Sequence, residues 1–265
     1  MRYSVIIKTI SVLLAALSSL SIQAQTTQFV DFENGTWDHG GIASTGWDSS
    51  EVSGTYTMGD GNSVTMNVSF HGSAVAASGN LSIIDEWYFS GFAFQALPSG
   101  STNSGSLANY ERVDFEFDQP VLINEFIIMD VDRDSWDDVL LVEGWLDNGG
   151  VGTLGSGITS TYGFRNTTNL DTETIFGETH VTVASGANTV SGSESDMLID
   201  FSQAVDAISL YYWNGDYGST ASTQTIGIAG NGITVTTVPE PVPEPSSVLL
   251  MISGLSALLL RRHRR

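Results

Sequence analysis

The sequence predicts an all-β protein whose main body is an antiparallel β-sandwich of jelly-roll type, flanked by a signal peptide and a short C-terminal transmembrane helix. Apolar and polar residues alternate with a period of two along several short runs, which is typical of strands with one buried face. Gly, Ser, Asn and Asp separate these runs, and no window of ten or more residues in the body carries a helical stripe. Many short antiparallel strands close most simply into a sandwich.

Residues 1–24 are expected to form a secretory signal peptide. Arg2 and Lys8 flank the start, residues 10–20 are apolar, and Ala24 provides a small residue for cleavage before Gln25. No cysteine follows Ala24, so lipoprotein processing is excluded. The body, residues 26–237, should therefore cross the inner membrane and face outward.

The body shows its clearest strand pattern in four places, at residues 63–70, 114–118, 180–183 and 226–235. About 210 residues are enough to bury one core, so the body is expected to be a single domain. The chain has no cysteine, which excludes disulfides in spite of the expected export. Its stability must come from the core, with bound metal as a further source.

The charge of the body excludes some partners. Between residues 26 and 238 the basic residues are Arg112, Arg133 and Arg165, against 28 acidic ones, which gives about −25. Nucleic acid and anionic lipid surfaces would be repelled by such a surface. Bound divalent cations, or a saline habitat that screens the repulsion, explain it better.

An internal match suggests two related hairpins. Phe117-Asp-Gln-Pro-Val121 corresponds to Phe201-Ser-Gln-Ala-Val205 at an offset of 84 residues, and each copy predicts a strand, a tight turn and a strand. Any β-hairpin with such a turn would look the same, so the match alone does not establish a repeat. If both are central strands of a sandwich, the acidic pairs that follow them should emerge at similar edges. These pairs are Asp130 with Asp132 and Asn214 with Asp216.

The run from Asp130 to Asp138 is the densest chemical feature of the body. Its five carboxylates belong to Asp130, Asp132, Asp134, Asp137 and Asp138. Carboxylates this close repel one another, and Ca²⁺ bound by six to eight oxygens would relieve the repulsion. The run begins like an EF-hand loop, but Ser135 replaces the glycine and Leu141 the bidentate glutamate, so another loop geometry is expected.

This metal prediction, which includes Asn214 and Asp216, has two alternatives. The run can be a solvated acidic turn between strands at 121–129 and 138–146, in which Arg133 pairs with one carboxylate. It can also supply catalytic carboxylates.

Support for catalysis is thin, and no catalytic residue is assigned. His39, His71 and His180 do not occur in a metal-ligand spacing, and a Gly-x-Ser-x-Gly motif is absent. A secreted carbohydrate-active hydrolase that uses paired strand carboxylates is the alternative function. Its candidates are Glu111, Glu116, Glu125 and Glu143.

Carbohydrate binding is the better supported activity, because aromatic residues recur beside polar ones at expected strand ends and loops. Flat rings stack on sugar faces, and nearby Asp and Asn accept hydroxyl hydrogen bonds. Trp136 and Trp213 each lie beside an acidic loop and are expected to be exposed ligand-binding residues. Trp145 and one of Tyr211 or Tyr212 are expected in the core.

The C-terminal 28 residues contain three elements in a fixed order. Residues 238–245 form an extended linker, 246–260 an uncharged helix about 22 Å long, and 261–265 a basic cytoplasmic end. The helix is shorter than the hydrocarbon core of roughly 30 Å, which suits a temporary anchor in the inner membrane. The residues expected to act in sorting are Pro239, Glu240, Pro241, Pro243, Glu244, Pro245, Arg261 and Arg262.

This tail resembles the PEP-CTERM sorting signal of Gram-negative bacteria. The resemblance rests on the two Pro-Glu-Pro motifs, the Gly254-containing apolar segment and the basic end, about a tenth of the chain. It implies passage through the export machinery, processing by an exosortase and delivery to the cell surface or the extracellular matrix, often in bacteria that make exopolysaccharide. Which motif copy is read stays open. The body more loosely resembles the uncharacterised jelly-roll ectodomains of that group, through residues 130–133, 136–138 and 225–229.

Together these features predict an exported surface protein with a structural or adhesive role and calcium-dependent polysaccharide binding. The hydrolase is the alternative.

Overall fold

The computed structural model describes residues 25–72, 74–76, 80–86, 89–97, 110–131, 138–146, 158–159, 161–164, 170–175, 178–183, 196–214 and 224–238. Residues Thr26–Val238 form one compact unit. The expected signal peptide, the Pro-Glu-Pro motifs, the expected transmembrane helix and the basic end lie outside the described residues. Within the described ranges there is no helix long and apolar enough to cross a membrane.

The described part is all-β and its strand pairs are antiparallel, as the alternation predicted. The strands are β1 (Thr27–Asp31), β2 (Thr36–Asp38), β3 (Ala43–Thr45), β4 (Ser53–Thr57), β5 (Ser63–His71), β6 (Val75–Ala76), β7 (Ser82–Glu86), β8 (Phe89–Leu97), β9 (Tyr110–Met129), β10 (Asp138–Trp145), β11 (Ile158–Thr159), β12 (Thr161–Phe164), β13 (Leu170–Ile175), β14 (Glu178–Val183), β15 (Met197–Asp200), β16 (Val205–Asn214), β17 (Gln224–Ala229) and β18 (Gly232–Thr237).

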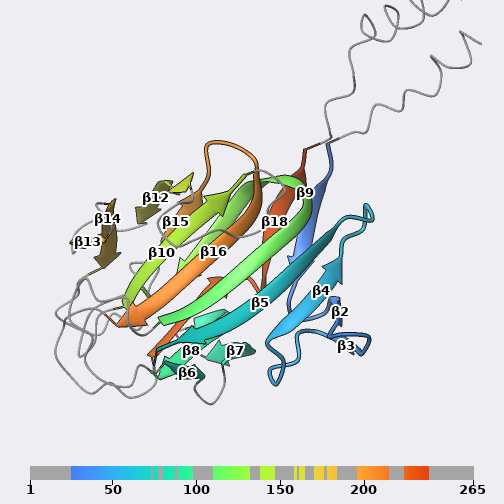
Figure 1. The fold of residues 1–265 in the computed structure, drawn as a ribbon, viewed down its shortest axis with the longest axis horizontal. Helices are drawn as coiled ribbons and strands as arrows, with labels where there is room; N and C mark the ends of the chain where they lie inside the picture. The colour runs from blue at the N-terminus through green and yellow to red at the C-terminus, as the bar shows by residue number, and fades with distance from the viewer. Residues whose placement is uncertain are drawn as a thin grey trace, which may run out of the picture. The chain divides into compact units, whose positions relative to one another are not determined.

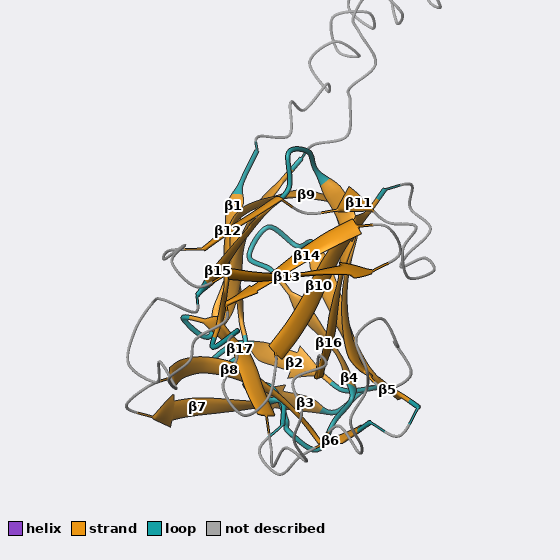
Figure 2. Cartoon of the chain, turned by 90° about the vertical axis from the view of Figure 1, so that its left-hand side faces the viewer, coloured by secondary structure: helices purple, strands orange, loops and turns teal. Residues whose placement is uncertain are grey.

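The long strand β9 joins two layers of strands. Up to Phe117 it pairs with β5 and β16, and from Val121 onward it pairs with β15, β17 and β18. We call the first set, which continues to β10 on one side and to β4, β2 and β3 on the other, the β16 layer, and the second set, with β8 and β1, the β18 layer. Figure 1 shows the bend of β9 between the two layers, and Figure 2 shows the layers from the side. This arrangement is consistent with a β-sandwich.

The two matched segments are the corners at which the chain changes layer. Phe117–Val121 leads from the β16 layer to the β18 layer, and Phe201–Val205 leads back from β15 to β16. The predicted hairpins are therefore wrong, because among the described strands neither the two halves of β9 nor β15 and β16 pair with each other. A hairpin and a corner both need a short polar interruption between apolar runs, so the pattern cannot distinguish them. The corners themselves lie together, since Val121 pairs with Val205.

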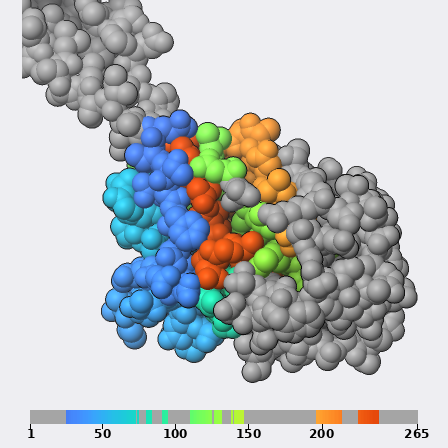
Figure 3. Space-filling model, turned by 180° about the vertical axis from the view of Figure 1, so that it is seen from behind, coloured from blue at the N-terminus to red at the C-terminus, as the bar shows by residue number. Residues whose placement is uncertain are grey.

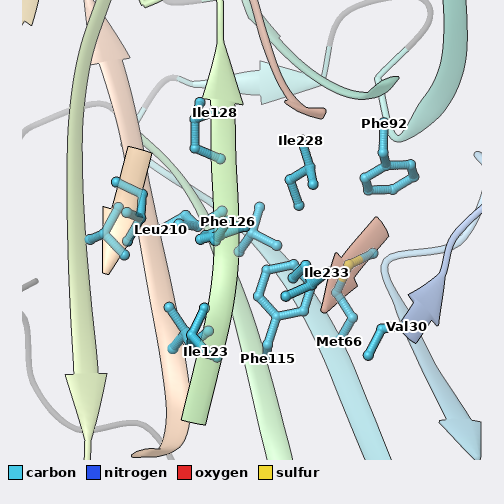
Figure 4. Close-up of a cluster of buried hydrophobic side chains, with 14 of the residues drawn as sticks. Val30, Met66, Phe92, Phe115, Ile123, Phe126, Ile128, Leu210, Ile228 and Ile233 are labelled. Atoms are coloured by element: carbon cyan, nitrogen blue, oxygen red, sulfur yellow. The ribbon is translucent and has the colours of Figure 1, made fainter. Parts of the chain in front are cut away.

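The core lies between the layers and confirms the alternation. Along β5, the side chains of Val64, Met66 and Val68 are buried, while the residues between them are partly exposed. Fully burying one Val, Ile, Met or Phe side chain stabilises the fold by about 1.5–3 kcal/mol. Figure 4 shows part of this core, including Val30, Met66, Phe92, Phe115, Ile123, Phe126, Ile128, Leu210, Ile228 and Ile233.

Both ends of the body lie at one end of the strands. Strands β1 and β18 pair along their length, and Thr237 N–H donates to the Thr26 carbonyl at 3.0 Å. Figure 3 shows β1 in blue beside β18 in red. Val238, expected in the linker, still donates its N–H to the Pro120 carbonyl at 2.9 Å, so it belongs to the body. We call this end, with Thr26, Pro120 and Val238, the proximal end, and the opposite one the distal end.

Candidate functional site

Four carboxylates lie near the distal end and act electrostatically on one another or on Tyr212, and we call Glu111, Asp130, Asp138 and Asp196 the distal carboxyl cluster. Glu111 lies at the start of β9, Asp130 directly after its end, Asp138 at the start of β10 and Asp196 directly before β15. Because β9 runs from the distal end to the corner and back, and its neighbours pair with it antiparallel, these positions fall at the same end.

Tyr212 of β16 connects members of this cluster. It lies opposite Glu111 in the register of β9 and β16, and its hydroxyl donates to Asp138 Oδ1 at 2.6 Å. Burial raises the pKa of the Tyr212 hydroxyl well above its usual value, and the negative charges of Asp138, Asp130 and Glu111 add to the effect. Three carboxylates therefore act electrostatically on one buried hydroxyl.

Glu111 is the most deeply buried member. Its side chain points to the same inward face of β9 as the core residues Val113 and Phe115, and its exposed fraction is 0 %. Its Oε1 accepts a hydrogen bond from Asn80 Nδ2 at 3.1 Å, whereas Oε2 has no hydrogen-bond partner. Burial raises the pKa of Glu111 to about 7, against the opposing effect of the Asn80 hydrogen bond. Glu111 is thus a buried carboxyl that favours its protonated form.

Asp130 occupies a backbone conformation that few residue types tolerate. Its φ of 65° lies in the left-handed region, in which Asp and Asn are the commonest residues after Gly. Burial, together with the negative charge of Asp196, raises the pKa of Asp130 to about 6. The turn after β9 therefore directs an acidic residue toward the other carboxylates.

The structure brings together part of the predicted metal site. Asp130 and Asp138 both belong to the distal cluster, and Asn214 is the register partner of Asp138. Asp132, Asp134, Trp136, Asp137 and Asp216 lie outside the described residues. Among the residues that are described, no three His, Cys, Asp or Glu side chains are placed so that they could hold a metal ion.

Trp213 is buried, so the exposure predicted for it is wrong. Its exposed fraction is 3 %, and it packs with Leu141 and Tyr211 in a small second cluster, against which Tyr110 lies. The position of Trp213 beside an acidic loop in the sequence does not show whether its side of β16 is buried in the fold. The burial predicted for Trp145 is confirmed, and of Tyr211 and Tyr212, one of which was expected in the core, both are buried.

A hydrogen-bonded network lies on the outward side of the β16 layer, and no motif in the sequence predicted it. Asp114 Oδ1 accepts hydrogen bonds from Arg112 Nε at 2.8 Å and from Ser209 Oγ at 2.5 Å. Ser209 Oγ in turn accepts from Trp145 Nε1 at 2.9 Å, and the guanidinium lies 5.2 Å from the centre of the Tyr211 ring. The signal in the sequence was Arg112, one of three basic residues in the body, two positions before an aspartate on a strand.

The network continues into a row of partly buried polar side chains over β5 and β9. Asn67 Nδ2 donates to Glu116 Oε1 at 3.1 Å. The ring of His71 stacks on that of Tyr110, with centroids 4.3 Å apart and an angle of 13° between the ring planes. Figure 1 shows β5 beside β9 in this layer. We call the six outward residues Asn67, His71, Tyr110, Arg112, Asp114 and Glu116 the polar face.

The carboxylates considered for a hydrolase do not form one group. Glu111 faces the core, whereas Glu116 and Glu143 face outward on β9 and β10, and Glu143 is buried. The side chain of Glu125 lies outside those described. His39 is held inside the fold by hydrogen bonds with the Ser53 carbonyl and with Ser44 Oγ.

Comparisons with protein-family models, curated proteins and solved structures found no match to this chain.

Proposed function

We propose that the chain is an exported, surface-sorted protein with a β-sandwich body of jelly-roll type, and that its role is structural or adhesive rather than enzymatic. The sorting tail supports export and exosortase processing, through the motifs at 239–241 and 243–245 and the arginines at 261–262. The acidic body argues against nucleic acid as a partner. Exopolysaccharide is the proposed extracellular ligand.

One structural observation carries the adhesive role. The body begins and ends at its proximal end, where β1 and β18 pair, so the tail leaves from the end opposite the distal carboxyl cluster. A body attached to its tail at the proximal end would leave its distal end free of that attachment. This supports an adhesive role.

Calcium at the distal end is part of the proposal. Asp130 and Asp138 lie in the distal cluster, and the proposed ligand set is completed by Asp132, Asp134, Asp137, Asn214 and Asp216. Burial of several carboxylates near one another supports a bound cation, because each unneutralised charge in that position is costly. Calcium would neutralise the charges and fix the distal loop.

Sorting can be tested in a Gram-negative host that has an exosortase. We expect the native chain to be shortened near its Pro-Glu-Pro motifs and recovered at the cell surface or in the medium. Replacing Glu240 and Glu244 by Ala together should retain the unshortened chain in the membrane fraction, and the two single variants will show which copy is read. Immunoblotting of the fractions measures this. Equal release of the native chain and the double variant would contradict exosortase processing.

The calcium proposal predicts that millimolar Ca²⁺ raises the melting temperature of the native protein relative to a chelator, since a ligand bound only by the folded state stabilises it. The variant Asp130→Asn with Asp138→Asn should respond less, and Asp60→Asn, at the proximal end, serves as the control. Scanning calorimetry gives all three values. A native melting curve that is the same in calcium and in chelator would rule out the site.

The secreted hydrolase is supported less well. Glu111 is sealed in the core and Glu143 is buried, which leaves Glu116 as the partly exposed glutamate among the candidates whose side chains are described.

A further inference from the structure

We propose that the polar face of the β16 layer binds a segment of neutral polysaccharide. This inference rests on the proposed polysaccharide binding and assigns it to Asn67, His71, Tyr110, Arg112, Asp114 and Glu116, in place of the buried Trp213.

The polar side chains of this face are already held in position. Ser53 Oγ donates to Asn67 Oδ1 at 2.7 Å, and Asn67 donates to Glu116 at 3.1 Å, so the amide is fixed between β4 and β9. Arg112 is fixed by Asp114 at 2.8 Å with both side chains mostly buried, and Ser69 Oγ lies 3.2 Å from His71 Nε2. Binding to fixed groups loses little side-chain entropy, which favours weak ligands such as sugar hydroxyls.

The aromatic part of the face lies at its distal edge. His71 and Tyr110 are register partners on β5 and β9, and their stacked rings are partly exposed. Pyranose rings have apolar faces that pack against aromatic rings, while their hydroxyls bond to adjacent polar groups. Moving along the strands toward the proximal end, the Arg112–Asp114 pair and the Asn67–Glu116 pair come next. Their order fits a chain that lies along β5 and β9.

The charge of the face selects a neutral polymer. Arg112 is the one Lys or Arg in the part of the chain that the structure describes, and its charge is matched by Asp114. Glu116 and the exposed Asp118 add negative charge on the same strand. A uronate-rich or sulfated polysaccharide would therefore be repelled, whereas the hydroxyls of a neutral one can donate to the partly exposed carboxylate of Glu116 and accept from the Asn67 amide.

The test uses the full chain in mild detergent, with chelator present so that calcium makes no contribution. Affinity electrophoresis in gels containing dextran, a soluble β-glucan, galactomannan or alginate gives a dissociation constant for each polymer. Asn67→Ala and His71→Ala each remove one contact from the face. Asn124→Ala is the matched control, because Asn124 is an exposed residue of the β18 layer that donates to Thr236 at 2.6 Å.

We expect at least one neutral polymer to retard the native chain, and alginate not to. Asn67→Ala and His71→Ala should each weaken that binding by about tenfold, the effect of losing one good hydrogen bond or ring contact, and Asn124→Ala should leave it unchanged. Melting temperatures within a few degrees of the native value will show that the variants are folded.

The possible results distinguish the polar face as the binding site from polysaccharide binding by the protein in general. If a polymer is bound equally by the native chain and all three variants, the polar face is not the site, although polysaccharide binding stands. Preference for alginate over the neutral polymers would overturn the charge argument and with it this site. If the native chain binds none of the polymers, with or without calcium, both the site and the proposed polysaccharide binding are wrong.

Discussion

Glu111 and Asp114 are two buried acidic residues only three positions apart on β9, and their surroundings are opposite. Glu111 faces the core, accepts one hydrogen bond from Asn80 and keeps one oxygen without a partner. Asp114 faces outward and is met by Arg112 and Ser209. Since successive side chains of a strand point to opposite faces, an odd separation places the two carboxylates on different sides of the β16 layer.

The difference shows how one strand can hold one buried carboxyl without a cationic partner and another paired with a guanidinium. Without a cationic partner, burial favours the protonated acid, and the pKa of Glu111 rises to about 7. Asp114 instead has the Arg112 guanidinium at 2.8 Å, a charge-assisted contact on a mostly buried surface. Glu111 therefore links the stability of the fold to pH, whereas Asp114 holds Arg112 and Ser209 in place on the outward side.

Removing the inner carboxyl should have the larger effect on stability. The folded pKa of Glu111 is about 7, above its usual value of 4.5. Below pH 4.5 both the folded and the unfolded state hold the proton. Between pH 4.5 and 7 the unfolded state releases it first, so the native protein should lose roughly 3 kcal/mol of stability across this window as pH rises. Glu111→Gln should abolish that part of the slope and be the more stable protein at pH 8.

Urea unfolding of the native chain and of Glu111→Gln at pH 5 and pH 8 measures this difference. Glu116→Gln, on the outward side of the same strand, is the control for removing one negative charge from a very acidic body. If the stability difference between native and Glu111→Gln is the same at both pH values, the inner carboxyl is not the titrating group.

Removing the outer carboxylate should have a smaller effect of opposite sign. Asp114→Ala takes away the acceptor shared by Arg112 and Ser209, and we expect a loss of about 2 kcal/mol at pH 7. Asp114→Asn keeps an acceptor oxygen and should lose about half as much. Equal, negligible losses for the two variants in urea unfolding would show that the ion pair does not stabilise the outward side.

The fold was predictable to the extent that it depends on local alternation. The pattern at 63–70 gave a strand whose inward residues, such as Val64 and Met66, are those that the structure buries. The hairpin predicted at 117–121 is wrong, because the parts of β9 before and after this segment pair with strands far away in the sequence rather than with each other. Register between distant strands is set by packing of the whole core, which no short window contains.

The site was predictable to a lesser extent. The density of acidic residues drew attention to Asp130 and Asp138, but Glu111 lies about twenty residues earlier and acts on the same Tyr212 hydroxyl only because β9 bends back. Trp213 stands beside polar residues in the sequence, whereas in the fold it is buried with Leu141 and Tyr211. Burial on the outward side of a sheet depends on what covers it, which a strand's own pattern does not encode.

By itself, the sequence determined the properties that follow from composition and local order: an acidic, cysteine-free all-β body between a signal-like start and a sorting-like tail. Tertiary structure decided which acidic residues are neutral or paired, where the two ends of the body meet, and which side carries the polar face. The physical reason is that charge and alternation are properties of neighbouring residues, while the burial of a carboxylate and the choice of its partner depend on strands brought together from across the whole chain.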